Sequence, residues 1–294
     1  MTTARPAPAV VPPDTDLTLP PGADVEVVTD DGATLSVTVA GDGSSRAATV
    51  VLPHCWTGSR INGVPVARRL IATGHRVVLY DHRGHGASTL GTAPLTIERL
   101  GADLAAVVEQ LDMHDTVLAG HSMGGMTVMA MACHHPALVR DRVRGLALIA
   151  TAGHGLAERW RGRLLRQVLR SGLTDRTMGW PRAGFAFVRP IFGAGADPAH
   201  VEATRALFAA TPAPVRLDCA EAMGAMDLRQ VLRDVDVPTI VLLGRRDTLI
   251  VNELTRAIVD HIDGAQLVEL PGAGHMLPLE RPDEVAAAIR RLAG

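Results

Sequence analysis

Hydrophobic and polar positions follow two different periods along this chain. Short β-branched apolar runs, typical of strands, recur between segments whose apolar residues repeat every three or four positions, as in helices. The strand-like runs are residues 25–28, 34–39, 49–52, 76–80, 116–119, 145–150, 239–243 and 266–270. The helical patterns are residues 64–72, 97–111, a stretch from Met123, 252–262 and 282–292. Strands separated by helices predict an α/β fold, with a mostly parallel sheet covered on both faces.

The beginning of the chain departs from this alternation. Residues 25–28 and 34–39 flank Asp30-Asp31-Gly32, which predicts a hairpin that supplies an antiparallel edge to the sheet. Before it, residues 1–21 contain six prolines, which interrupt any apolar segment long enough for a secretion signal. Because proline at this density favours extended backbone, we expect residues 1–23 to form a Pro-rich tail or a strap across the surface.

A second departure lies between two strands. Residues 154–219 contain most of the aromatic side chains and little β pattern. An insertion of this size predicts a helical cap over the carboxyl edge of the sheet, where open α/β folds keep their sites. The expected core then comprises residues 24–153 and 220–294.

Composition narrows the class of protein. Among 294 residues, 47% are hydrophobic, which is ample for a buried core, and 29 basic against 31 acidic residues leave a charge of −2. That balance argues against a nucleic-acid partner. No apolar run approaches the roughly 18 residues of a membrane-spanning helix. The chain has three cysteines, which lie far apart in the sequence, and this argues against a disulfide framework. Because such usage fits a reducing compartment, we predict a cytoplasmic location.

The first candidate for chemistry is Gly120-His121-Ser122-Met123-Gly124, which follows a predicted strand and precedes a predicted helix. In this G-x-S-x-G pattern the chain turns sharply and holds the serine in a strained conformation with its hydroxyl exposed. The flanking glycines let strand and helix approach without a Cβ clash. A chance match is the alternative, and the strand–turn–helix context argues against it. We predict that Ser122 is a nucleophile.

A serine nucleophile needs a base, and the base needs an acid to orient it. Among twelve histidines, His275 lies in a glycine-rich loop directly after the last strand. His121 is better explained as a packed residue of the sharp turn. Asp247 follows the penultimate strand, and Ser122, Asp247, His275 is the chain order that this architecture requires. A helix cap or turn role is the alternative for Asp247, and Asp227 is a weaker candidate because it does not follow a strand.

The third component is a cradle for the oxyanion of a tetrahedral intermediate. Residues 52–59 leave a strand at the same edge of the sheet as Ser122. We expect the backbone N–H groups of Trp56 and Met123 to form the oxyanion hole, where one lost donor costs about 3 kcal/mol.

From about residue 25 to its end, the chain resembles the α/β-hydrolase superfamily. The matching stretches are His54-Cys55-Trp56-Thr57-Gly58-Ser59, Asp81-His82-Arg83-Gly84-His85-Gly86-Ala87-Ser88, residues 120–125, Gly244-Arg245-Arg246-Asp247 and Gly274-His275. The resemblance implies an eight-stranded sheet, a helical cap between the sixth and seventh strands, and a Ser-Asp-His triad that works through an acyl-enzyme. Two residues depart from the pattern: Cys55 stands at a usual glycine, and Val251 at a frequent proline.

Residues 81–88 are close to a signature of the superfamily. We expect them to be structural, with glycine turns and an Arg–Asp pair that braces the loops. A metal site formed by His54, His82 and His85 is the alternative. We expect no cofactor.

The residue types favour some branches of the superfamily over others. A serine at position 122 argues against epoxide hydrolases and dehalogenases, which use an aspartate. We predict an esterase-like or lipase-like enzyme that cleaves a small-molecule acyl ester or thioester. The alternatives are a non-hydrolytic relative, such as a cofactor-free haloperoxidase-like or cyclising enzyme, and a ligand receptor on the same fold.

One feature of the expected cap is its charge. Residues 156–190 hold eight arginines against Glu158 and Asp175, with apolar residues at helical spacing among them. The simpler interpretation is a cap helix that packs on the sheet and leaves its arginines in solvent. The alternative is contact with an anionic substrate or lipid surface.

Overall fold

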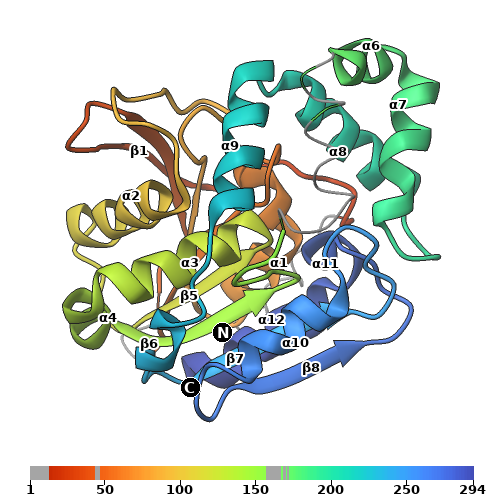
Figure 1. The fold of residues 1–294 in the computed structure, drawn as a ribbon. Coiled ribbons are helices and arrows are strands. Elements are labelled where there is room, and N and C mark those ends of the chain that lie inside the picture. Colours follow the sequence, from red (N-terminus) through yellow and green to blue (C-terminus); the bar gives the residue numbers. More distant parts are fainter. Residues whose placement is uncertain (1–12, 44–46, 157–166, 168–169, 171) are drawn as a thin grey trace, which may run out of the picture.

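A single eight-stranded sheet organises the molecule (Figure 1). The computed structural model describes residues 13–43, 47–156, 167, 170 and 172–294. The strands are β1 (Gly22–Val28), β2 (Thr34–Ala40), β3 (Thr49–Pro53), β4 (Arg76–Tyr80), β5 (Thr116–His121), β6 (Val143–Ile149), β7 (Thr239–Gly244) and β8 (Gln266–Leu270). Their order in the sheet is β1-β2-β4-β3-β5-β6-β7-β8. The predicted hairpin is confirmed, because β1 pairs antiparallel with β2 and β2 with β4, whereas all later pairs are parallel.

Helices cover both faces of the sheet, which confirms the predicted fold class. On one face lie α2 (Ile97–Gln110), α3 (Met123–His134), α4 (Pro136–Arg142) and α10 (Asn252–Val259), and on the other lie α1 (Val64–Ile71), α11 (Leu277–Glu280) and α12 (Pro282–Ala293). Successive strand residues point to opposite faces. In β5, Leu118 therefore packs in the first core, while Val117 and Ala119 pack in the second. This is why the central strands are apolar at every position.

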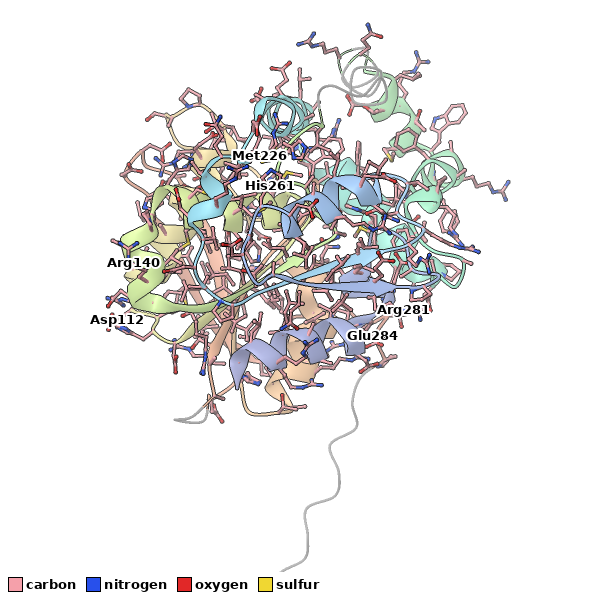
Figure 2. All side chains as sticks on the ribbon, turned by 60° about the horizontal axis from the view of Figure 1, so that its bottom comes forward. Asp112, Arg140, Met226, His261, Arg281 and Glu284 are labelled. Atoms are coloured by element: carbon pink, nitrogen blue, oxygen red, sulfur yellow. The ribbon has the colours of Figure 1, made fainter. Side chains whose placement is uncertain are left out.

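Polar side chains occupy the outside of these layers, as Asp112, Arg140 and Glu284 do in Figure 2. Within the described ranges, no helix combines the length and the apolar character that crossing a lipid bilayer requires.

The segment between β6 and β7 carries the helices expected of a cap. They are α6 (Leu173–Gly179), α7 (Pro181–Val188), α8 (Pro198–Ala210) and α9 (Ala213–Ala225), with short 3-10 turns at η2 (Arg189–Ile191) and η3 (Val231–Asp234). Figure 1 shows α6, α7 and α8 gathered away from the sheet. Residue 219, where the expected cap ends, lies inside α9.

The described part of the Pro-rich segment runs along the surface. Asp14 pairs with Arg69 of α1 at 2.7 Å, and its carbonyl lies 2.9 Å from Nε2 of His200 in α8. Residues 13–18 therefore link a core helix to a helix of the insertion, while residues 1–12 lie outside the described part of the chain.

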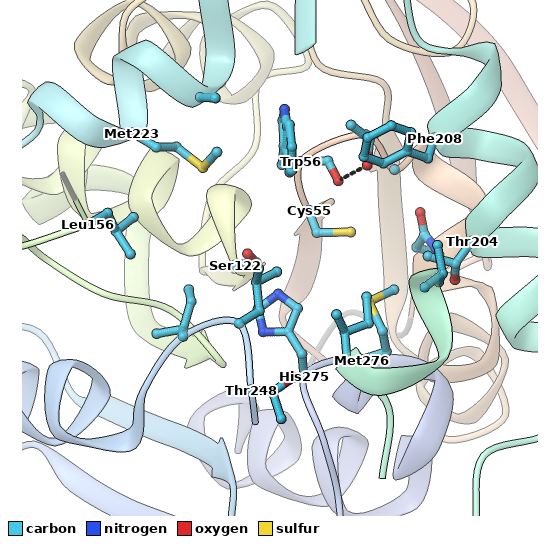
Figure 3. Close-up of a pocket in the computed structure, with 18 of the residues that line it drawn as sticks. Cys55, Trp56, Ser122, Leu156, Thr204, Phe208, Met223, Thr248, His275 and Met276 are labelled. Carbon is cyan, nitrogen blue, oxygen red and sulfur yellow. Dashed lines mark hydrogen bonds between the residues drawn. The ribbon is translucent and has the colours of Figure 1, made fainter. Parts of the chain in front are cut away.

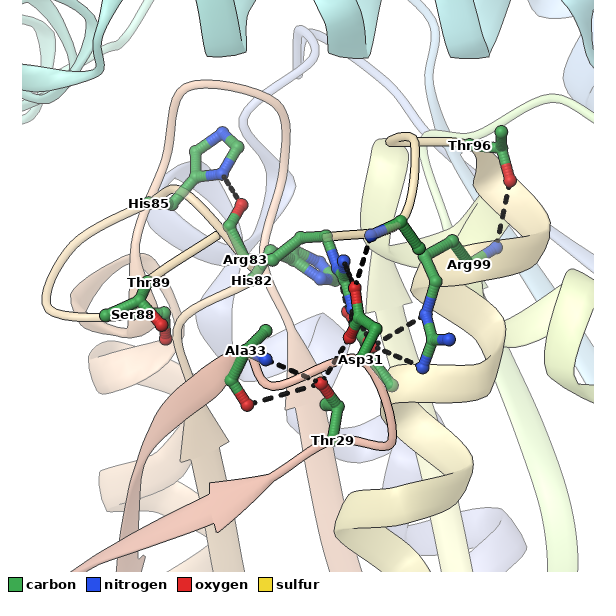
Figure 4. Close-up of polar contacts among 12 residues, drawn as sticks. Thr29, Asp31, Ala33, His82, Arg83, His85, Ser88, Thr89, Thr96 and Arg99 are labelled. Atoms are coloured by element: carbon green, nitrogen blue, oxygen red, sulfur yellow. Dashed lines mark hydrogen bonds and ion pairs between the residues drawn. The ribbon is translucent and has the colours of Figure 1, made fainter. Parts of the chain in front are cut away.

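The loop at residues 81–88 contains the predicted Arg–Asp pairing (Figure 4). The guanidinium of Arg83 is fully buried and donates to Asp103 of α2 at 2.6 Å and to Asp31 of the β1–β2 turn at 2.8 Å. Arg99 also contacts Asp103, at 3.2 Å. A buried charge is tolerated only when it is paired and hydrogen bonded. Arg83 therefore ties the hairpin, the loop and α2 together.

Candidate active site

Ser122 occupies the sharp turn between β5 and α3. Its backbone has φ 55° and ψ −116°, a conformation that is costly for a residue with a side chain. Neighbouring chain holds it there: the Ser122 N–H donates to Ile149 O at 2.8 Å, and Thr151 Oγ1 donates to Ser122 O at 2.7 Å. The turn places the Ser122 side chain on the wall of a cavity (Figure 3).

Close packing around the turn explains the two glycines of the motif. A Cβ on Gly120 would collide with Gly124 O, and one on Gly124 would collide with Pro53 O and lie 2.8 Å from His54 O. Glycine is required because strand, helix and the loop after β3 meet without room for a methyl group.

This contact leads to a prediction for Gly124→Ala. The added methyl group would push α3 away from residues 53–54 and displace the Met123 amide relative to the loop after β3. We expect ester hydrolysis to fall by about 100-fold, as small misplacements of catalytic groups do. The measurement is kcat/KM on a p-nitrophenyl ester. Gly179→Ala is the control, since a Cβ at Gly179 meets nothing within 4 Å; equal activities of the two variants would contradict the prediction.

His275 and Asp247 form a buried hydrogen-bonded pair. His275 Nδ1 lies 2.7 Å from Asp247 Oδ2, and each side chain is 2% exposed. The other carboxylate oxygen of Asp247 accepts from the N–H groups of Leu249 and Ile250 at 2.8 and 2.9 Å. Asp247 therefore also has the turn role considered for it. Because the carboxylate accepts the Nδ1 proton, Nε2 of His275 carries the lone pair that a general base needs.

His121 has the packing role expected of it. Its Nε2 donates to the backbone carbonyl of His275 at 2.8 Å, so the residue before Ser122 braces the loop that carries His275. Burial, together with His275, lowers the pKa of His121 to about 3, which keeps its ring neutral. Asp227, the weaker candidate for the acid, forms a half-exposed ion pair with Arg229 at 2.5 Å.

Ser122 and His275 line the same cavity, of about 330 Å³, and Asp247 lies behind His275. Figure 3 shows the imidazole beside Ser122. The structure thus brings all three residues named from the sequence to one place. Helices α8 and α9, between β6 and β7, supply further lining residues that the sequence pattern did not identify, including Leu207, Phe208 and Met223. No periodicity reveals which side chains of such helices face a cavity.

The loop after β3 orients the Trp56 amide. Cys55 O accepts hydrogen bonds from His54 Nδ1 at 2.7 Å and from the Gly58 N–H at 3.0 Å. Because a trans peptide is planar, the Trp56 N–H points opposite to that carbonyl. Among the described residues, neither the Trp56 N–H nor the Met123 N–H donates to a protein group. Thr57, next in the loop, has φ 55°, a second strained residue beside the cavity.

Hydrogen bonds already occupy most ring nitrogens of the three histidines considered for a metal. His54 Nε2 accepts from the His82 N–H at 2.9 Å, and His82 Nε2 donates to His54 O at 3.1 Å. His85 Nδ1 lies 3.1 Å from Arg83 O. The described residues contain no cluster of three or more histidine, cysteine or acidic residues arranged to hold a metal ion. These contacts favour the bracing role.

The histidine cluster predicts a pH dependence of stability. Burial, with the other histidines, lowers the pKa of His54 well below 6.5, and burial lowers the pKa of His82 to about 3 and of His85 to about 4. The unfolded chain therefore takes up protons near pH 6.5 while the folded cluster stays neutral. The stabilisation is complete above pH 6.5 and is lost as the pH falls from 6.5 toward 4, by up to about 1.4 kcal/mol per pH unit for each histidine.

Urea unfolding at pH 7.5, 6.5 and 5.5 measures this slope. The His85→Gln side chain cannot take up a proton, so its unfolding free energy is expected to fall less steeply below pH 6.5. His134→Gln, at an exposed position, serves as the matched control. A slope in His85→Gln equal to that of the unmodified protein would contradict the prediction.

The arginines of the expected cap are only partly described. Arg159, Arg161, Arg163 and Arg166 lie outside the described residues. Of the others, Arg170 pairs with Glu221 at 2.5 Å, Arg189 donates to Phe192 O and Ala194 O, and Arg176 and Arg182 are exposed. None of these four lines the cavity.

Comparison with known proteins places these features in context. The sequence profile of the alpha/beta hydrolase family matches residues 37–288. The 3-oxoadipate enol-lactonase 2 of Acinetobacter baylyi is 29% identical over 218 residues, which cover 72% of this chain and 76% of that protein. The pimeloyl-[acyl-carrier protein] methyl ester esterase of Xanthomonas campestris is 26% identical over 256 residues, covering 82% and 93%.

A solved structure is similar over almost its whole length. The enol-lactonase of Burkholderia xenovorans superposes with a TM-score of 0.77 at 28% identity, covering 91% of this chain and 99% of that one. Because the family profile spans most of the chain and the sheet, turn and loops agree with it, the chain belongs to the alpha/beta hydrolase family.

Proposed function

We propose that the protein is a serine hydrolase that cleaves a carboxylic ester or thioester through an acyl-enzyme. The observation that carries the proposal is the His275–Asp247 hydrogen bond of 2.7 Å beside a cavity that Ser122 also lines. A nucleophile in a strained turn, with an oriented imidazole nearby, is the arrangement that acyl transfer requires. The relatives named as a lactonase and a methyl ester esterase support the same reaction class.

In the proposed reaction, Ser122 Oγ attacks the ester carbonyl while Nε2 of His275 takes its proton. Asp247 holds the imidazole by Nδ1 and stabilises the imidazolium. The oxyanion would bind the amides of Trp56 and Met123, whose N–H groups have no partner among the described residues. His275 then protonates the leaving alcohol or thiol. A water molecule, deprotonated by His275, attacks the acyl-serine and releases the acid.

Labelling with a fluorophosphonate tests the proposal. An activated serine attacks phosphorus and loses fluoride, so peptide mass spectrometry should find one adduct, on Ser122. Labelling of Ser122→Ala at the same level would contradict the assignment. No labelling of the folded protein would favour the receptor alternative.

Contact of the Arg-rich segment with an anionic group stays a prediction, since half of its arginines lie outside the described residues. The proposed chemistry does not depend on it.

A further inference from the structure

We infer that the substrate is a small, uncharged ester with apolar groups on both sides of its carbonyl. The inference rests on the proposed function and goes further by naming the substrate class. It is carried by the chemistry of the cavity wall and by the position of Ser122 within the cavity.

The wall of the cavity carries no charged side chain among the residues that the structure describes there. Most of its side chains are aliphatic, aromatic or sulfur-containing, as in Met126, Leu254 and Phe187. Burial raises the pKa of the Cys55 thiol to about 12, so this residue, which stands where the superfamily usually has glycine, is also neutral.

Most polar side chains of the wall already form hydrogen bonds within the protein, although the buried Nδ2 of Asn62 has no partner among the described residues. The hydroxyls of Thr57, Thr204 and Thr248 donate to backbone carbonyls at 2.7, 2.8 and 2.9 Å. Asn62 Oδ1 accepts from the Ser59 N–H at 2.8 Å. None of these groups is a cation that could neutralise a carboxylate on the substrate.

Two arginines next to the wall have partners in the helices between β6 and β7. Arg205, beside Thr204 in α8, is paired with Glu202 and donates to Met178 O at 2.6 Å. Arg216 of α9 is buried and donates to Phe208 O at 3.0 Å, and it also pairs with Asp175. Both guanidinium groups stabilise the insertion.

The cavity extends to both sides of Ser122. In Figure 3, Leu156 and Met223 lie on one side of the serine, and Phe208 and Thr204 lie on the opposite side. An ester whose carbonyl carbon meets Ser122 therefore directs its acyl group and its alcohol group toward different, mainly apolar walls. A volume of about 330 Å³ is at the small end of ligand cavities, which sets the size of the ester.

The physical basis of selectivity is desolvation. Moving an ionised carboxylate from water to such a wall without a partner is far more costly than moving an alkyl group of the same shape. Each buried CH₂ group, in contrast, favours binding by roughly fourfold.

Two pairs of esters of matched shape test this inference. On the acyl side, methyl 5-methylhexanoate is compared with monomethyl glutarate, and on the alcohol side 4-methylpentyl acetate is compared with 4-acetoxybutanoate. Each pair replaces an isopropyl group by a carboxylate. We expect kcat/KM to be lower for the charged member of each pair, by about 100-fold or more. A charged ester that reacts equally well or better overturns the inference for that side.

Charge variants test the two sides separately. In one of the two pairs, Thr204→Arg should raise the ratio of kcat/KM for the charged ester to kcat/KM for the isopropyl ester. We expect this ratio to be about 100-fold higher than in Thr204→Gln, the control that adds a polar side chain without a charge. Met223→Arg, compared with Met223→Gln, should do so in the other pair. If the folded variants change the same pair, or neither pair, the two-sided placement is wrong. If a variant does not fold, the kcat/KM values of the unmodified protein for the charged and the isopropyl esters still test the inference.

The outcome also separates this inference from the proposed function. If no member of either pair is hydrolysed by the folded protein and the fluorophosphonate does not label Ser122, the proposed function fails. Calorimetric binding of the same pairs to Ser122→Ala then decides the inference: tighter binding of the isopropyl members supports it, and equal or weaker binding overturns it.

Discussion

Ser122→Ala is expected to lower kcat for ester hydrolysis by about 10⁶-fold, the size of effect seen when a serine nucleophile is removed. Without Oγ no acyl-enzyme forms, and His275 has no hydroxyl to deprotonate. Substrate binding should survive, because the cavity wall is otherwise unchanged. The measurements are steady-state kinetics on a p-nitrophenyl ester and trapping of the acyl-enzyme by rapid acid quench.

Ser36→Ala is the matched control for this variant. Ser36 lies in β2, which contributes no residue to the cavity wall, and its side chain is half-buried on the sheet. Its removal should leave kcat within about twofold, as surface-like substitutions do. A folded Ser122→Ala protein that keeps more than a small fraction of the turnover would overturn the assignment of the nucleophile.

Asp247→Asn is expected to reduce kcat by up to about 10⁴-fold with the fold intact. The two N–H groups of Leu249 and Ile250 that now bind Oδ1 would hold the amide oxygen in the same place. The amide NH₂ would then face Nδ1 of His275, which must accept instead of donate. That tautomer carries its proton on Nε2, where it cannot take a proton from Ser122.

The control for Asp247→Asn is the same change at Asp227, the other carboxylate considered as the acid. Asp227 pairs with Arg229 at the surface, so Asp227→Asn should keep full activity. Activities are compared at one pH on one ester, and circular dichroism checks that both variants are folded. Near-full turnover in Asp247→Asn would reject its role.

The ends of helices and strands are the part of the secondary structure that the sequence pattern predicts least well. The pattern predicts a first strand from residue 25, yet β1 begins at Gly22, because backbone pairing with Ala40 extends the ladder through exposed residues. The pattern also predicts a helix over residues 252–262. The corresponding helix, α10, ends at Val259, because the chain then turns toward β8. Apolar periodicity indicates which residues are buried and not which backbone groups are hydrogen bonded. It therefore does not predict where a helix or strand ends.

Helix α3 illustrates the same limit in the core. From Met123 to Ala132 every residue is buried, so the helix has no polar face and no amphipathic period. Only its position after the G-x-S-x-G turn indicated a helix. The reason is structural: from Met123 to Ala132, α3 lies between the sheet and α2, and the helix becomes exposed only at its last residue, His134.

Sequence alone was sufficient for the α/β class, the antiparallel edge and the candidate residues Ser122, Asp247 and His275, because these depend on local periods and on motifs at strand ends. Tertiary structure decided which groups meet. It placed Asp247 rather than Asp227 at 2.7 Å from His275, engaged the histidines of residues 54–85 in bracing contacts, and lined the cavity with residues of the insertion. The physical reason is that strand and helix patterns are set by neighbours in sequence, whereas a catalytic contact and a cavity wall are set by segments far apart in the chain that share one small volume.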